Sequence, residues 1–258
     1  MSIVLDKQKE ILNKLKEIKN LDGELFREKI IQITKDSTSL TFQDVLIKNV
    51  PLTEYPPFIC KKELSIKFWN EISIKTHGKL NLTINDSILV PSKLFLSSES
   101  ITSCNKENLS ENEIENLVNT YRRLFESVRQ FLLPAFEIII NKNGFIYWFD
   151  ILKKIKEFEN NYDELFKSMD NNSRRFIAHE SYYLNENFIM FIDKNGNETK
   201  TTSGELCDKL LDITALIFAL YWGLSEVFIP IIIKGYQTAP IDKLKKAFVD
   251  LPFLNESI

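Results

Sequence analysis

The stretch Ser110–Ile140, SENEIENLVNTYRRLFESVRQFLLPAFEIII, decides the fold class of this 258-residue chain. Ser110 followed three residues later by Glu113 is a capping box, a common start of an α-helix. Behind it, apolar residues recur at helical spacing: Ile114, Leu117, Val118, Tyr121, Leu124, Phe125, Val128, Leu132, Ala135, Phe136 and Ile139. We therefore predict one long amphipathic helix here, with Pro134 inside it and Asn143-Gly144 at its end.

The pattern after this helix predicts more helices and one hairpin. A second long helix is expected to carry its apolar stripe from Trp148 to Phe166. Phe188–Asp193 and Glu198–Thr202 flank Lys194-Asn195-Gly196-Asn197, which is a β-hairpin signal. Thr202 with Glu205 can cap a final helix that reaches about Phe228. Together these elements predict an α+β fold that is mainly α.

Residues 1–100 show a different pattern. An N-terminal amphipathic helix and a short helix at Glu24–Ile33 come first. Leu64–Phe68, Ile72–Thr76 and Leu80–Ile84 then alternate or carry β-branched residues, and His77-Gly78-Lys79 separates the last two as a hairpin would. We expect residues 1–100 to form a small N-terminal α+β unit of unknown role. Residues 101–109 are then a linker, and residues 110–258 a helical domain with an inserted β-hairpin.

Charge and cysteine content limit the function. With 33 Lys+Arg against 36 Asp+Glu the net charge is −3, which excludes a generally basic nucleic-acid wrapper. Cys60, Cys104 and Cys207 are odd in number and far apart, as expected for reduced thiols in a cytoplasmic protein. With two histidines and no CxxC pair, a zinc site is not expected.

No signal peptide and no membrane span is expected. The N-terminal stretch is charged from Asp6 onward. The longest apolar stretch, Leu210–Ile233, is interrupted by Asp212, Glu226 and Pro230, so we interpret it as a buried helix.

The pair Arg174-x4-His179 is the pattern in this sequence that indicates a chemical reaction. A guanidinium can bind phosphate oxygens in a forked geometry and stabilise the extra charge of a phosphodiester transition state. An imidazole titrating near neutrality can accept a proton from a ribose 2′-hydroxyl or donate one to the leaving oxygen. Two copies across a two-fold axis could supply an acid and a base together, without a metal.

The string SRRFIAHESYY, residues 173–183, follows two amphipathic helices and precedes the hairpin and the capped helix. In this setting it resembles the HEPN superfamily of prokaryotic defence and toxin ribonucleases. The resemblance covers roughly residues 110–230. It implies a homodimeric, metal-independent RNA endonuclease, a hydrolase without cofactor that acts in the cytoplasm in phage defence, abortive infection or a toxin system. An antitoxin or regulatory protein is the expected partner, and no membrane is.

By this resemblance Arg174 is the phosphate-binding arginine and His179 the general acid or base. Arg175 stands where the family usually has Asn, Asp or His, so which of the two arginines meets the phosphate stays open. Arg175, Tyr182 and Asn172 are candidate substrate-binding residues, and Tyr182 is equally typical of a core residue in a strand. Arg122, Arg123 and Arg129 are interpreted as a solvated helix face.

Two other functions remain open. A catalytically inactive HEPN-like interaction or regulatory subunit could bind a protein partner through the apolar Ile213–Trp222 stretch. The N-terminal unit could instead sense a small molecule.

Overall fold

The computed structural model describes residues 10, 13–49, 56–78, 109–141, 146–169, 182–185, 188–192 and 195–249. These residues are mostly helical, with one small antiparallel sheet, which confirms an α+β, mainly α fold. The helices are α2 (Gly23–Asn49), α3 (Pro56–Lys75), α5 (Glu111–Ile140), α6 (Trp148–Ile155), α8 (Ser203–Thr238) and α9 (Ile241–Val249). The strands are β1 (Tyr182–Asn185), β2 (Phe188–Ile192) and β3 (Glu198–Thr202).

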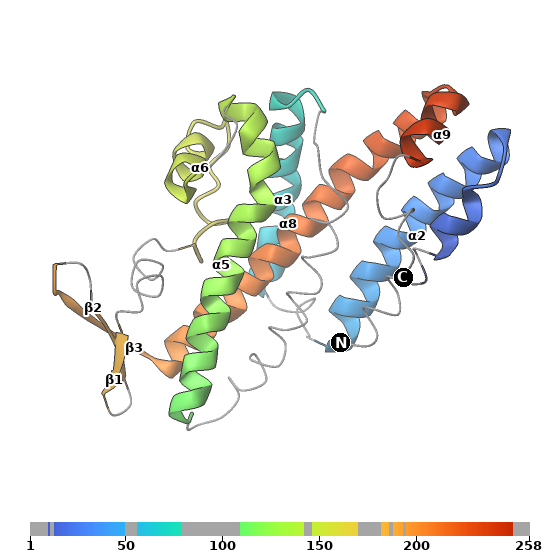
Figure 1. The fold of residues 1–258 in the computed structure, drawn as a ribbon. Helices are drawn as coiled ribbons and strands as arrows, with labels where there is room; N and C mark the ends of the chain where they lie inside the picture. Colours follow the sequence, from blue (N-terminus) through green and yellow to red (C-terminus); the bar gives the residue numbers. More distant parts are fainter. Residues whose placement is uncertain are drawn as a thin grey trace.

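Three long helices, α3, α5 and α8, surround the main hydrophobic core (Figure 1). Trp69 of α3 lies in the middle of it, with its ring 5.7 Å from that of Phe131 and 6.0 Å from that of Phe228, between centroids. The indole Nε1 donates a hydrogen bond to the carbonyl oxygen of Leu220 at 2.7 Å, so the one polar atom of this buried side chain is satisfied. One aromatic side chain thus joins all three helices.

The predicted helix after Ser110 is confirmed as α5. Glu113 accepts hydrogen bonds from the backbone N–H of Ser110 at 2.9 Å and from its hydroxyl at 2.8 Å. The helix passes through Pro134 and stops at Ile140, where Asn141 takes a left-handed conformation with φ 53°. Asn143 and Gly144, which we expected to end it, lie outside the described residues.

The second long helix was predicted too long. α6 ends at Ile155, and residues 156–169 follow as an irregular segment. The apolar residues that suggested a helix are nevertheless buried there: Phe158, Tyr162, Leu165 and Phe166. The reason for the break is tertiary: the backbone N–H of Glu159 donates to the carboxylate of Glu71 on α3 at 2.7 Å rather than to a helical carbonyl.

The predicted hairpin is confirmed, and a third strand extends it. β2 pairs with β3 and with β1, both antiparallel, in the order β1-β2-β3. Ile189 and Phe191 of β2 point into the core. The sheet leads directly into the start of α8 (Figure 1).

The final capped helix is also confirmed, and it is longer than expected. The Thr202 hydroxyl accepts from the backbone N–H of Glu205 at 3.1 Å, and the Glu205 carboxylate accepts from the N–H of Thr202 at 2.9 Å. The helix continues through Pro230 to Thr238. Pro230 is exposed, so water can satisfy the helical carbonyl that its missing N–H leaves open.

By length and composition, α8 could cross a membrane, and no other helix of the described residues could. Of its most apolar window, 44% is buried inside the protein. Every residue from Ile213 to Leu220 is buried, which agrees with the buried helix predicted there.

The strands predicted at Leu64–Phe68 and Ile72–Thr76 are wrong, because both stretches belong to α3 or its last turn. The buried positions of α3 and its last turn follow helical spacing: Phe58, Lys61, Ser65, Phe68, Trp69, Glu71, Ile72 and Thr76. Four of these are polar, so the stripe is not apolar throughout and was not recognised as helical. His77 and Gly78 terminate the helix with φ 53° and 69° rather than forming a hairpin, and Leu80–Ile84 lies outside the described residues.

The second helix was predicted too short, since α2 runs from Gly23 to Asn49. Its first half forms a smaller hydrophobic cluster with α9, a helix that the sequence did not predict. Phe26 and Phe248 meet edge to face with ring centroids 5.3 Å apart. The predicted linker, residues 101–109, is outside the described residues except for Leu109, so the division into two parts stays a prediction.

Two of the three cysteines are described. Cys60 is a free, exposed thiol, whereas Cys207 is disulfide-bonded. The expectation of reduced thiols therefore holds for Cys60 and fails for Cys207, and Cys104 lies outside the described residues.

Candidate functional site

Four of the predicted site residues, Asn172, Arg174, Arg175 and His179, lie outside the described residues. They belong to the segment 170–181, which joins Met169 to Tyr182 in the chain. Both of these flanking residues are described. The structure therefore defines what the predicted site is attached to at each end.

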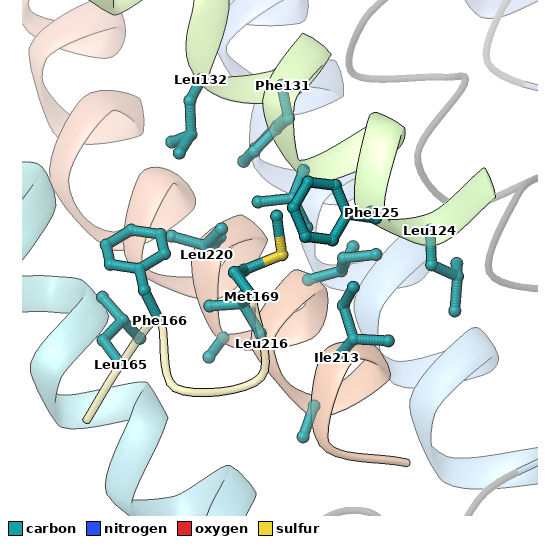
Figure 2. Packing of buried hydrophobic residues seen from close by; sticks show 14 of the residues in the cluster. Leu124, Phe125, Phe131, Leu132, Leu165, Phe166, Met169, Ile213, Leu216 and Leu220 are labelled. Atoms are coloured by element: carbon teal, nitrogen blue, oxygen red, sulfur yellow. The ribbon is translucent and has the colours of Figure 1, made fainter. Parts of the chain in front are cut away.

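At the first end, Met169 is 3% exposed and belongs to the main core. Figure 2 shows its side chain directed into the space between α5 and α8, among Phe125, Ile213 and Leu216. The segment that carries Arg174 thus starts from a fixed point in the core.

At the second end, Tyr182 opens β1 opposite Phe191 of β2, with the two ring centroids 6.2 Å apart. The side chain is half-buried and packs against the main core. Its neighbour Tyr183 is 40% exposed and donates its hydroxyl to Glu198 at 3.0 Å, a hydrogen bond that raises the pKa of this phenol. Of the two tyrosines, Tyr182 is thus the one at the edge of the core, which agrees with the core interpretation and leaves its predicted substrate role untested.

The irregular segment before Met169 is held by two buried side chains. Lys61 of α3 is 3% exposed, and its Nζ donates to the carbonyl oxygens of Glu164 at 3.1 Å and Leu165 at 3.3 Å. The same Nζ lies 3.4 Å from the carboxylate of Asp212 on α8. Tyr121 of α5 donates its hydroxyl to the carbonyl oxygen of Ser168 at 2.9 Å.

Glu71, 7% exposed on α3, organises the first part of the same segment. Its carboxylate accepts from the N–H of Glu159, from the amide of Asn160 at 3.3 Å and from the hydroxyl of Tyr162 at 3.0 Å. Burial by itself would raise the pKa of Glu71, but these hydrogen bonds and Lys75 outweigh it and lower that pKa. Burial and the bond to Glu71 raise the pKa of Tyr162. Glu71 is therefore charged, and Tyr162 neutral, at physiological pH.

The arginines of α5 divide into two kinds. Arg122 and Arg123 are exposed, as predicted for a solvated face. Arg129 is half-buried, pairs with Glu126 at 2.9 Å and donates to the carbonyl oxygen of Ile146 at 3.1 Å. Arg129 therefore connects α5 to the start of α6.

The other histidine, His77, is exposed in the turn that ends α3. Among the described residues, no three His, Cys, Asp or Glu side chains come together as a metal site would require.

No sequence pattern pointed to Lys61, Glu71 and Tyr121 as residues that shape this region. Tyr121 was predicted only as part of an apolar stripe. The available signal for Lys61 was its position in the helical spacing of Phe58, Ser65 and Phe68, which places it on the buried face of α3.

Comparison of the chain with protein-family models, with curated proteins and with solved structures finds no match. The resemblance to the HEPN superfamily therefore rests on the sequence motif and its helical setting alone.

Proposed function

We propose that this protein is a metal-independent endoribonuclease of HEPN type. Arg174 binds the scissile phosphate, His179 does general acid and base work, and two protomers complete one site. Cleavage leaves a 2′,3′-cyclic phosphate and a 5′-hydroxyl. By the resemblance, the role is phage defence or toxin activity under the control of a partner protein.

One observation carries this proposal: the pair Arg174-x4-His179 lies in a segment whose two flanks, Met169 and Tyr182, both pack against the α3–α5–α8 core. A catalytic pair must be held within a fraction of an ångström of its working geometry, and rigid helical elements provide such support. The predominantly helical fold is also the one that the resemblance implied.

The test is cleavage of a labelled single-stranded RNA in the presence of a chelator. The parent protein should cut, and His179→Ala should not, with circular dichroism and melting temperature unchanged. His77→Asn is the matched control, because it removes the other histidine at an exposed left-handed turn position that asparagine tolerates. Equal cleavage by the His179→Ala variant and the parent would show that the site is assigned wrongly.

A non-catalytic interaction subunit is the second candidate. The Ile213–Trp222 surface first considered for it is not available, since Ile213–Leu220 is buried within the chain. Further along α8, however, Ile231 and Ile232 are 40% and 39% exposed. This alternative expects no cleavage by the parent protein, and a stable complex with a partner that Ile231→Lys and Ile232→Lys abolish.

A further inference from the structure

We infer that the second half of α8 presents a surface on which a second copy of this chain docks. This surface, the α8 face, consists of two neighbouring rows of the helix, Glu226-Pro230-Lys234 and Val227-Ile231. The inference goes beyond the proposed function, because it names the residues through which two protomers meet. It concerns only the pairing of two chains, so it is tested without RNA cleavage.

The surroundings of α8 change along its length. Its first part packs between α3 and α5, and Phe228 is its last buried residue. Beyond that point the helix continues past α5 toward α9 (Figure 1). Tyr236 packs against the smaller cluster of α2 and α9, whereas Pro230, Ile231 and Lys234 are exposed, Ile231 by 40%. This part of α8 therefore has one side on the protein and an apolar side in water.

The charges on the α8 face select its occupant. Glu226 and Lys234 are both exposed, and no ion pair joins either of them to another described residue. They are eight residues apart, about 12 Å along a helix axis, with Pro230 midway between them. When a second α8 lies antiparallel across a two-fold axis near Pro230, Glu226 of each copy meets Lys234 of the other. The α8 face is thus complementary in charge to itself.

This pattern favours a second copy over other occupants. A two-fold axis matches Glu226 with Lys234 automatically, whereas a protein of unrelated sequence would match them only by chance. A bilayer with anionic lipids would repel the Glu226 carboxylate. A contact along one helix is small for a protein interface, and exposed ion pairs contribute little each, so we expect a dissociation constant of about 10–100 µM.

The experiment measures self-association of the full chain by analytical ultracentrifugation, over concentrations that span this constant. Glu226→Lys places a lysine opposite Lys234 at both contacts, and Lys234→Glu places a glutamate opposite Glu226 at both. Each variant alone should raise the dissociation constant about tenfold, because repulsion replaces attraction twice in each dimer. An equimolar mixture of the two variants should recover association, because every contact then joins opposite charges.

Asp208→Lys is the matched control. It also reverses an exposed carboxylate on α8, but its position lies near the start of the helix, outside the α8 face. The dissociation constant of this variant should equal that of the parent. All three substituted positions are exposed, so the fold should be retained, and circular dichroism checks it.

Three results would overturn the inference. The first is a parent chain that is monomeric throughout the range. The second is a dimer that both single variants keep, since it would form through another surface, while the two-protomer site of the proposed function would still stand. The third is equal weakening by Asp208→Lys, which would show a general effect of net charge.

Sedimentation with vesicles of phosphatidylcholine and phosphatidylglycerol tests the bilayer as occupant. Vesicle binding by a monomeric parent, abolished in Ile231→Lys, would assign the α8 face to the membrane and overturn the inference. Association is measured without RNA, so a parent that dimerises as expected and cuts no RNA would contradict the proposed function and support the inference.

Discussion

Gly223 of α8 lies so close to Ser65 of α3 that a methyl group on it would clash with the Ser65 hydroxyl oxygen and stand 2.7 Å from the Ser65 carbonyl group. Two of these contact atoms belong to the backbone, which cannot rotate away as a side chain can. These two small residues therefore allow the backbones of α3 and α8 to approach each other closely. The contact lies near the hydrogen bond that Trp69 donates to the carbonyl oxygen of Leu220.

Gly223→Ala should destabilise the protein. Overpacking of a close contact costs about 1–3 kcal/mol, and the better helix propensity of alanine returns up to about 1 kcal/mol. We expect a net loss of about 1–2 kcal/mol in the free energy of unfolding, measured by urea denaturation.

Gly235→Ala is the control on the same helix. Nothing lies within 4 Å of its added methyl group, so only helix propensity changes and stability should rise by up to about 1 kcal/mol. If both variants lost stability equally, the close approach at Gly223 would not be the cause.

Glu71 should make the protein sensitive to acid. Its pKa is lowered in the folded state, so its stabilising contribution is complete above the ordinary carboxyl pKa of about 4.3 and disappears as the pH falls through the lowered value. Glu71→Gln should therefore lose about 2 kcal/mol at pH 7, the size of a charge-assisted hydrogen bond.

The pH profile distinguishes this from a simple packing defect. The difference in unfolding free energy between the parent and Glu71→Gln should shrink as the pH drops below about 4. A difference that stayed constant from pH 7 to pH 3 would contradict a charged Glu71. Urea denaturation at several pH values measures it, and taking the difference between the two proteins cancels the titration of the other carboxylates.

The elements that the sequence predicted well are those whose signals are local. The capping boxes at Ser110 and Thr202 marked the starts of α5 and α8 correctly, because each involves residues three apart in the chain. α3 was predicted as strands because Leu64–Phe68 and Ile72–Thr76 alternate or carry β-branched residues, while the polar Lys61 and Ser65 on its buried face interrupt the helical stripe. The break after Ile155 depends on Glu71, 88 residues away from Glu159, and no local pattern contains that information.

The same distinction applies to the candidate site. Arg174 and His179 could be proposed from their spacing and from the helices and hairpin predicted around them, because the chemistry needs those two residue types near each other. Lys61 and Tyr121 could not, since their partners are backbone carbonyls that carry no sequence signature.

The cap of α8 should matter for stability. Thr202→Ala removes the hydroxyl that accepts from the N–H of Glu205, and loss of such a cap typically costs about 1 kcal/mol. A melting temperature lowered by a few degrees is expected. Thr238→Ala is the control, because its hydroxyl bonds to a carbonyl near the exposed end of the same helix and caps no N–H. An equal decrease in both variants would mean that the cap is not what stabilises the helix.

The choice between Arg174 and Arg175 can be settled by comparing their alanine variants. Arg175 has only three residues between it and His179, whereas the family pattern needs four to six, so Arg174 is the expected phosphate ligand. Arg174→Ala should lose at least a hundredfold in kcat, because a guanidinium that stabilises transition-state charge contributes about 3 kcal/mol or more. Arg175→Ala should keep kcat within a few-fold and weaken RNA binding in a salt-dependent way, as expected for a contact to a neighbouring phosphate. Single-turnover cleavage and filter binding at two salt concentrations separate the two effects, and a larger kcat loss in Arg175→Ala than in Arg174→Ala would reverse the assignment.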